Sequence, residues 1–296
     1  MSADGSVVVG NSNGQAFRWT ATGGMVGLGS DSDGRVATGV SDDGSVISGN
    51  RGLYQPFFRW TSTTGIIDLG FVQSFPSQDY KVSLSADGAV VVGSRGPGND
   101  AVRWTTTGGL VTLGYPPGKS YAYGVSADGS VVVGYGNSST TGGDEAFRWT
   151  SAGGMIGLGH LSNGFQSRAA SVNADGTVVV GDGGDGSAFR WTASGGMVGL
   201  GHLSGDASSS ASLVSTDGTV VVGYSYGSSY GSNQVFRWTA TGGMVGLGKL
   251  TGIGVNGVSA DGSVVVGNAI LRYFAITTLR PSAGRRPTGG SQSSAS

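Results

Sequence analysis

The sequence contains no cysteine, which excludes disulfide bonds, thiol catalysis and cysteine-based metal sites. Charged side chains are also scarce, since 17 basic and 18 acidic residues occur among 296, with a net charge of −1. A nucleic-acid interface requires a basic face, so we expect no nucleic-acid partner. The apolar runs are short, and none approaches the roughly 20 residues of a membrane-spanning helix, so no membrane span is expected.

Proline is rare, with 7 residues, and no helix start or stop signal is present. Glycine is abundant instead, with 59 residues, about one in five against a usual share of about 7%. With so little proline the chain is not collagen-like, and its ordinary aromatic content of 9% disfavours a disordered tract. The composition indicates an ordered, glycine-rich protein without helices.

One cassette of 39 to 47 residues recurs along the chain, in about six and a half copies. Its first landmark is an Asp-Gly pair, with a second glycine always six residues after the aspartate. The aspartates are Asp4, Asp43, Asp87, Asp128, Asp175, Asp217 and Asp261. Its second landmark is Arg-Trp-Thr, with a Leu-Gly pair always nine residues after the tryptophan. These motifs hold all six tryptophans, Trp19, Trp60, Trp104, Trp149, Trp191 and Trp238.

Each cassette predicts four short strands. Residues 125–134, Val-Ser-Ala-Asp-Gly-Ser-Val-Val-Val-Gly, form two strands around an Asp-Gly turn that tolerates positive φ. The Val-Val-Val run is apolar on both faces, which is typical of a strand buried on both sides. Phe-Arg-Trp at 147–149 alternates, with Phe and Trp on one face, and Met-Ile-Gly-Leu at 155–158 forms the fourth strand.

A single cassette cannot bury enough apolar surface to fold alone, so the cassettes must pack against one another. Four short strands in 40 to 50 residues are typical of a β-propeller blade. The sequence therefore predicts an all-β fold, a β-propeller of six or seven four-stranded antiparallel blades, with a β-solenoid as the alternative. A six-bladed ring would close by pairing the strand around Val258 with the first cassette, whereas a seven-bladed ring would contain incomplete blades. We expect one repeat domain, residues 1–276, and a disordered tail, residues 277–296.

The lengths of the connections divide each blade into two edges. The turns within the two hairpins never change length, whereas the connections after Val-Val-Val-Gly and after Leu-Gly vary from cassette to cassette. In a meander, the constant turns emerge at one edge of the sheet and the variable connections at the other. Because loops on a rigid scaffold usually carry function, we expect any partner at the variable edge.

The cassette at Val125–Gly159, with its Ala-Phe-Arg-Trp-Thr segment, resembles the bacterial extracellular HAF-repeat family, and the resemblance covers residues 2–267. It implies a secreted or surface protein, often an autotransporter passenger, and no known catalytic residues. The histidine of the family's His-Ala-Phe motif is missing here. Its position holds Gln15, Pro56, Asp100, Glu145, Ser187 or Gln234.

The predicted ligand-binding residues are Tyr135, Tyr224, Tyr226 and Tyr230, which we place in the two longest connections, 135–145 and 224–234. Tyrosine with serine and glycine is the composition of adaptable binding loops. The alternative is that these tyrosines are solvent-exposed loop residues without a role in binding.

Other candidates have structural interpretations. The tryptophans suit packing between blades, with stacking on sugars as the alternative. The Arg-Trp arginines suit hydrogen bonds or ion pairs within their own blade, and the repeat aspartates suit their own turns. Asp182 and Asp185 look slightly like a calcium loop but lack a nearby glutamate ligand. His160 and His202 occupy aligned positions without carboxylates placed to complete a metal site, so no metal and no cofactor are predicted.

The leading functional hypothesis is a non-enzymatic extracellular or cell-surface scaffold that binds an unknown protein or glycan at the variable edge. A lectin-type glycan-binding propeller is the first alternative. A propeller glycan hydrolase or lyase is the second, and it would require paired carboxylates near the central channel. The acids outside the repeat positions are scattered along the chain instead.

Overall fold

The computed structural model describes residues 1–29, 34–51, 56–70, 82–95, 100–114, 118–138, 142–162, 164–228, 233–249, 254–269 and 272–277. These residues form 26 β-strands in seven antiparallel sheets, five with four strands and two with three. None of the described residues lies in a helix, so this part of the chain holds no helix that could span a bilayer.

The first three sheets cover the N-terminal half of the ring. Blade 1 consists of β1 (Val7–Ser12), β2 (Gln15–Thr20) and β3 (Gly24–Gly27). Blade 2 consists of β4 (Val36–Val40), β5 (Val46–Asn50), β6 (Phe57–Thr61) and β7 (Gly65–Asp68). Blade 3 consists of β8 (Ser83–Leu84), β9 (Val90–Arg95), β10 (Asp100–Thr105) and β11 (Gly109–Thr112).

The remaining four sheets follow in chain order. Blade 4 consists of β12 (Ser120–Val125), β13 (Val131–Asn137), β14 (Asp144–Thr150) and β15 (Gly154–Gly157). Blade 5 consists of β16 (Arg168–Val172), β17 (Val178–Asp182), β18 (Ala188–Thr192) and β19 (Gly196–Gly199). Blade 6 consists of β20 (Asp206–Val214), β21 (Val220–Gly227), β22 (Gln234–Thr239) and β23 (Gly243–Lys249). Blade 7 consists of β24 (Gly254–Val258), β25 (Val264–Ala269) and β26 (Arg272–Thr277).

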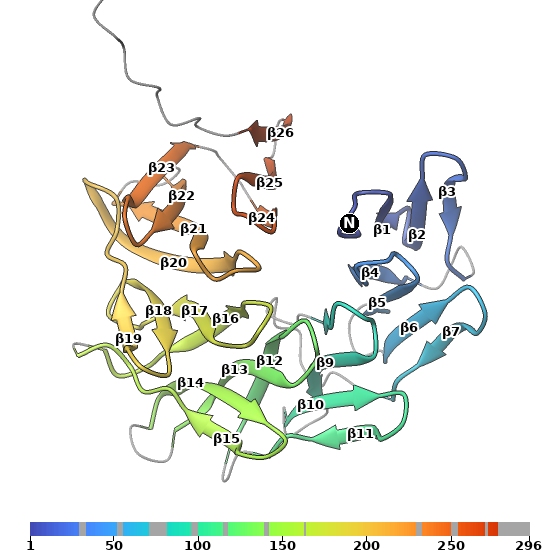
Figure 1. Cartoon of the computed structure of the whole chain (residues 1–296), viewed down its shortest axis with the longest axis horizontal. Helices are drawn as coiled ribbons and strands as arrows, with labels where there is room; N and C mark the ends of the chain where they lie inside the picture. Colours follow the sequence, from blue (N-terminus) through green and yellow to red (C-terminus); the bar gives the residue numbers. More distant parts are fainter. Residues whose placement is uncertain are drawn as a thin grey trace, which may run out of the picture.

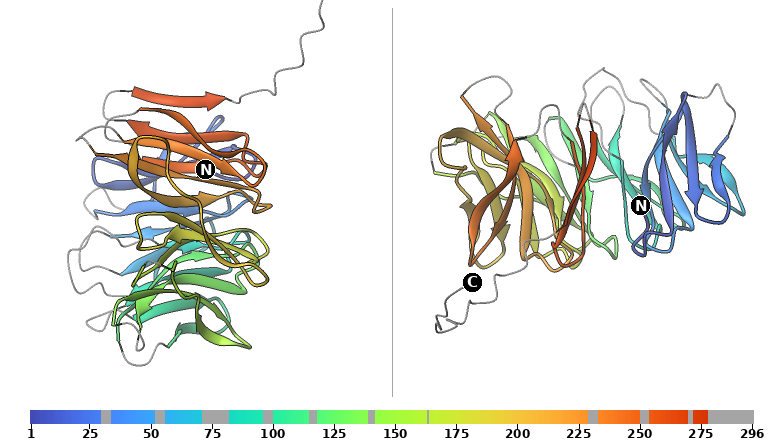
Figure 2. Two further views of the ribbon diagram at one scale, coloured as in Figure 1. Left: turned by 90° about the vertical axis from the view of Figure 1, so that its left-hand side faces the viewer. Right: turned by 90° about the horizontal axis from the view of Figure 1, so that it is seen from above.

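The sheets stand side by side around a central channel, which confirms the predicted β-propeller (Figure 1). In each four-stranded blade the first strand lies innermost and the last strand lies at the rim, and the side views show the sheets packed face to face (Figure 2). Seven sheets make up the ring, with blades 1 and 7 on either side of its opening. A six-bladed closure is wrong, because the first sheet contains only β1, β2 and β3, and β24 forms a separate sheet with β25 and β26.

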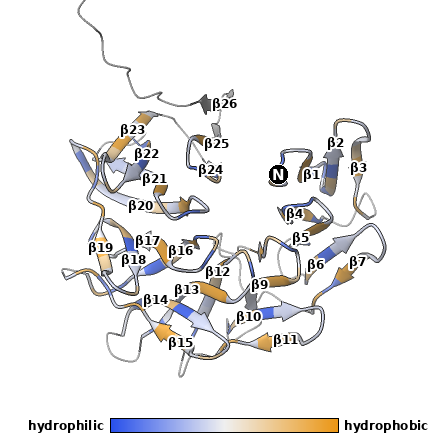
Figure 3. Ribbon diagram, in the orientation of Figure 1, coloured by the Kyte–Doolittle hydropathy of each residue, from blue (hydrophilic) through white to orange (hydrophobic). Residues whose placement is uncertain are grey.

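The core lies between the blades and is built from the second and third strands. Phe147 of β14 and Val132 of β13 are fully buried, in one cluster with residues of the preceding blade. Trp149 packs against that cluster but stays half-buried, and Trp19 is 37% exposed. The predicted packing of tryptophan between blades is therefore confirmed for Trp149, although its ring is less deeply buried than that of Phe147. The rim strands are hydrophobic but largely exposed (Figure 3).

The constant edge, made of the Asp-Gly turns and the turns before each rim strand, is held by hydrogen bonds. Asp128 Oδ1 accepts hydrogen bonds from Ser126 Oγ at 2.6 Å and from the Ser130 N–H at 3.0 Å. These bonds hold the pKa of Asp128 at about 2, so the aspartate serves its own turn. Neighbouring turns are joined as well, since the Ala127 N–H donates to the Ala174 carbonyl of the next blade at 2.9 Å.

The Arg-Trp arginines also join blades, which corrects the expectation of partners within one blade. Arg103 of blade 3 donates from Nε to the carbonyl of Gly129 in blade 4 at 3.2 Å. Its guanidinium lies over the Trp149 ring of the same neighbouring blade, 5.9 Å from the centroid. Arg59 repeats both contacts one blade earlier. The motif therefore binds consecutive blades together through a hydrogen bond and a cation–π contact.

A β-bulge explains the second glycine of the cassette. In blade 5 the register shifts between Ala169 and Ser171, which brings the backbone of β16 close to Gly181. A Cβ on Gly181 would overlap the Arg168 carbonyl oxygen, so only glycine fits there. The bulge fixes how the ends of β16 and β17 present their side chains at the variable edge.

Candidate functional site

Three of the four predicted tyrosines lie on strands, which corrects their placement in loops. Tyr135 belongs to β13, and Tyr224 and Tyr226 belong to β21, because both strands continue beyond the cassette glycine toward the variable edge. Alternation along β21 puts Tyr224 and Tyr226 on one face, with ring centroids 6.2 Å apart. Tyr230 lies outside the described residues.

The residue that follows the second glycine of the cassette, the glycine six residues after the aspartate, occupies the same place in every blade. In blades 4, 5 and 6 this residue is Tyr135, Asp182 and Tyr224, respectively. Three successive blades therefore present chemically distinctive side chains at equivalent positions of the variable edge. Blades 1 and 2 have asparagine there, Asn11 and Asn50.

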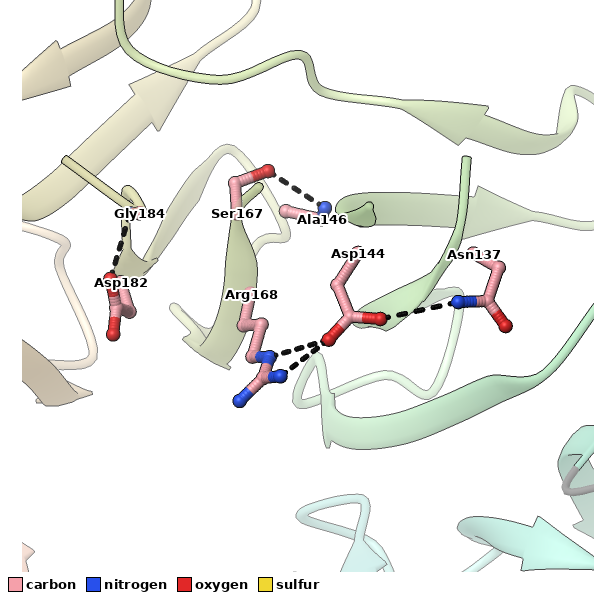
Figure 4. A network of polar contacts seen from close by, with 7 residues as sticks. All are labelled: Asn137, Asp144, Ala146, Ser167, Arg168, Asp182 and Gly184. Atoms are coloured by element: carbon pink, nitrogen blue, oxygen red, sulfur yellow. Dashed lines mark hydrogen bonds and ion pairs between the residues drawn. The ribbon is translucent and has the colours of Figure 1, made fainter. Parts of the chain in front are cut away.

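Arg168, the first residue of β16, connects blades 4 and 5 at this edge (Figure 4). Its Nε and Nη2 donate to Oδ2 of Asp144 at 2.8 and 2.5 Å. Its guanidinium also lies 4.9 Å from the centroid of the Tyr135 ring. Tyr135 itself is only 8% exposed and packs against Tyr121 and Tyr123, so it supports the arginine from beneath.

Electrostatic interactions across the strands stabilise the charged form of Arg168. Burial by itself would lower the pKa of Arg168, but the hydrogen bonds and charge of Asp144 outweigh burial and raise that pKa. Asp182 is the register partner of Arg168 on β17, and its charge acts in the same direction. Burial, together with Tyr224 and the charge of Asp182, raises the pKa of Tyr226.

A pocket of about 310 Å³ opens beside this arginine, between blades 5 and 6. We call it the variable-edge pocket. It is lined by Gln166, Ser167, Arg168, Asp182, Gly184, Gly186, Ser208, Ser209 and Tyr226. Its lining is mainly polar, with guanidinium, carboxylate, amide and hydroxyl groups beside one aromatic ring.

Two buried serines fix the walls of the pocket. Ser167 Oγ accepts a hydrogen bond from the Ala146 N–H of blade 4 at 2.9 Å and donates to the Gly159 carbonyl at 2.6 Å. Ser209 Oγ makes the equivalent bonds one blade later, with the Ala188 N–H and the Gly201 carbonyl. Because each hydroxyl joins two blades, the strands that line the pocket are held in place by the packing of the ring.

The calcium and histidine candidates have local roles. Oδ1 of Asp182 accepts the Gly184 N–H, and Oδ1 of Asp185 accepts the Ser187 N–H, both at 2.8 Å. His160 and His202 contact the carbonyl groups of Leu161 and Leu203 at 3.2 Å. Within the described part of the chain, no three His, Cys, Asp or Glu residues cluster as metal ligands.

The central channel has a different character. A cavity of about 620 Å³ lies among the inner strands and is lined mainly by aliphatic and hydroxyl residues, such as Val40, Leu84, Tyr123, Ser171 and Val255. Its described lining includes no charged side chain, so the paired carboxylates that a hydrolase requires are not found among these residues.

Sequence reasoning missed Arg168 and Asp144 as a pair. They lie 24 residues apart and meet because blades 4 and 5 pack together, which no motif encodes. Arg168 nevertheless carried a signal, since it is the one charged residue in an inner strand otherwise made of alanine, serine and valine. Asp182 could have been found by aligning the cassettes on their second glycine, because it then occupies the same position as Tyr135 and Tyr224.

The comparisons with known proteins establish the fold alone. No protein-family model matches the chain, and no curated protein matches it significantly. Virginiamycin B lyase from Staphylococcus aureus is similar in structure, with a TM-score of 0.56 and 14% identity over 87% of this chain and 85% of that one. An oligogalacturonate lyase in complex with manganese has a TM-score of 0.55 and 14% identity over 89% of this chain and 77% of that one.

TolB from Acinetobacter baumannii is a third similar structure. Its TM-score is 0.52 at 14% identity, and the match covers 82% of this chain. The chain spans 63% of the length of that protein. At 14% identity these similarities support the propeller fold, but they do not assign a function to any residue of this chain.

Proposed function

We propose that this chain is a non-enzymatic, extracellular or cell-surface binding scaffold whose partner docks at the variable edge, over the variable-edge pocket. The cassette's resemblance to extracellular HAF repeats, which include autotransporter-like surface proteins, supports the location. The propeller supplies a rigid ring on which differing side chains are displayed at one edge.

The difference between the two edges carries this proposal. At the constant edge the polar groups are used within the protein, as Asp128 serves its turn and Arg103 binds the next blade. At the variable edge, polar side chains of blades 5 and 6 line one pocket, and several of them have no hydrogen-bond partner among the described residues. A surface whose polar groups are unused can bind another molecule without breaking the fold.

A lyase or hydrolase remains the enzymatic alternative, and two of the similar structures are lyases. The described lining of the central channel gives this alternative no carboxylate or histidine side chain. A scaffold that binds through its edge is therefore the better-supported proposal. Release of new reducing or unsaturated ends from a glycan by the purified chain would favour the enzyme instead.

The edges can be compared in one binding experiment. The purified chain is applied to an array of printed glycans and to immobilised mucin and collagen. The variable-edge double variant is Arg168→Ala with Tyr226→Ala. The matched constant-edge double variant is Ala152→Glu with Ser194→Glu, two exposed turn residues in blades 4 and 5.

We expect every specific signal to fall at least tenfold in the variable-edge variant and to persist in the constant-edge variant. The reverse pattern would place the binding surface on the opposite edge. Far-ultraviolet circular dichroism and thermal melting of both variants show whether each ring is intact.

A further inference from the structure

The variable-edge pocket contains polar groups that make no hydrogen bond within the part of the chain that the structure describes. Arg168 Nη1, Asp182 Oδ2 and the side-chain amide of Gln166 make no hydrogen bond to any described residue, although other atoms of the first two do. The hydroxyl groups of Ser208 and Tyr226 are likewise unpaired among the described residues, and both residues line the pocket. Five hydrogen-bonding groups of residues that line one pocket therefore have no partner among the described residues.

The charges of the pocket limit what it can bind. Asp144 already neutralises Arg168 at 2.5 Å, and Asp182 adds a second carboxylate beside the same guanidinium. The two carboxylates outnumber the one guanidinium, which disfavours phosphate, sulfate and other anions. The free nitrogen of the Arg168 guanidinium can only donate a hydrogen bond, so a group bound against it must be an acceptor, which an ammonium group or a metal ion is not. A neutral ligand that both donates and accepts hydrogen bonds avoids both penalties.

The arrangement of donors and acceptors suits vicinal hydroxyl groups. Arg168 and Asp182 are direct register partners on β16 and β17, so a donor and an acceptor project side by side from one sheet (Figure 4). A hydroxyl group donates to the carboxylate while it accepts from the guanidinium. Tyr226, whose ring stands beside Tyr224, supplies an aromatic wall for the C–H face of a ring.

Size and rigidity are consistent with a single ring. The pocket volume of about 310 Å³ lies at the small end of the range of roughly 300–1,000 Å³ for small-molecule sites. Arg168 is fixed by Asp144 and Tyr135, and Asp182 is fixed by the Gly184 N–H. Because these side chains are ordered before binding, little further entropy is lost when a ligand arrives.

We propose that the variable-edge pocket binds one neutral sugar ring of a glycan, with Arg168 and Asp182 on adjacent hydroxyl groups and Tyr226 against the ring face. This inference rests on the proposed function and names the ligand class for the same edge. It requires no metal and no chemical step.

The test is a titration of the full chain, labelled with ¹⁵N, with single sugars monitored by amide chemical shifts. The neutral probes are galactose, glucose, mannose and N-acetylglucosamine, the anionic probe is galacturonate, and the cationic probe is glucosamine. We expect at least one neutral sugar to bind saturably, in the roughly millimolar range usual for a small ligand, with shifts at residues 166–168, 182–184 and 208–209. Asp182→Ala should weaken this binding at least tenfold, and His202→Gln, an exposed residue outside the pocket, should not.

Each outcome decides between the proposals. Tighter binding of galacturonate or glucosamine than of every neutral sugar would overturn the neutral-ligand assignment. Absence of shifts at the pocket with all six sugars, while a protein partner still requires Arg168 and Tyr226, would overturn the sugar site and leave the binding edge standing. If neither the sugars nor a protein partner bind at this edge, the sugar site and the proposed binding edge are both contradicted. The titration of the unmodified chain remains decisive even where a variant fails to fold.

Discussion

Arg168 of blade 5 binds Asp144 of blade 4 through two nitrogens that share one carboxylate oxygen, at 2.8 and 2.5 Å. The Arg168 side chain is 49% exposed and the Asp144 side chain 18%. An ion pair this open to solvent contributes little to stability, about 1 kcal/mol or less. Its geometric effect is larger, because it holds the guanidinium at the mouth of the variable-edge pocket.

Asp144→Asn should therefore separate binding from stability. We expect the midpoint of urea unfolding to stay nearly unchanged, while binding at the variable edge weakens several-fold because Arg168 loses its orientation. Unfolding curves and binding isotherms of the same preparation measure both. A large loss of stability with affinity retained would show that the pair has a structural role instead.

Core substitutions should rank by burial. Phe147→Ala removes a fully buried ring and should cost about 3–5 kcal/mol in the free energy of unfolding. Trp149→Ala should cost less, about 1–3 kcal/mol, because that ring is half-buried and part of its surface already meets water. Urea denaturation gives both values, and a Trp149 variant as damaged as the Phe147 variant would contradict the observed burial.

The bulge glycine should tolerate no side chain. Gly181→Ala places a Cβ against the Arg168 carbonyl oxygen, so we expect a loss of roughly 1–3 kcal/mol and a displaced Arg168. Gly199→Ala in the same blade is the matched control, since its nearest neighbour would be the flexible end of Leu161 at 3.3 Å. Thermal melting compares the two, and equal behaviour would show that the strands relax at no cost.

Acid should weaken the ring through its turns. Hydrogen bonds within the Asp-Gly turns lower the pKa of the repeat aspartates, to about 2 for Asp4, Asp43, Asp128 and Asp261. Since these folded-state pKa values lie below the unfolded value of about 3.9, the carboxylates stabilise the fold fully above that value. Their contribution is lost as pH falls through about 4 toward 2.

Melting temperatures recorded between pH 6 and pH 2 measure this effect, and we expect a steep decline below about pH 4. Asp128→Asn should make the decline shallower, because one titrating group is removed. A melting temperature that stays level from pH 4 to pH 2 would mean that the turn hydrogen bonds do not distinguish the folded from the unfolded state.

Local patterns were sufficient to predict most of the fold. The Asp-Gly turns, the Val-Val-Val strands and the constant spacings all act within one cassette, and they lead to the propeller because each fixes a hairpin. Alternation placed phenylalanine and tryptophan on the same face, but it did not show that Phe147 is fully buried whereas Trp149 is only half-buried. The number of blades could not be predicted in this way. The sequence allowed the strand around Val258, which is β24, to close a six-bladed ring with the first cassette or to belong to a seventh blade.

The site was only partly predictable for a related reason. Tyr224 and Tyr226 were found by composition, but their alternation around Ser225 already indicated a continuing strand instead of a loop. The contact of Arg168 with Asp144 and the joining of blades by Arg103 depend on packing between cassettes. Such contacts follow from the curvature of the ring, and the spacing of residues along the chain does not show which residues of neighbouring blades meet.

The most direct test of the account is an amide hydrogen-exchange footprint of the chain, with and without the partner recovered from the binding arrays. We expect protection in residues 164–169, 182–188 and 206–210, at the ends of strands that surround Arg168. Exchange at the constant-edge turns, residues 126–130, 151–154 and 173–177, should stay unchanged. Protection confined to those turns, with the Arg168 region unaffected, would contradict the assignment of binding to the variable edge.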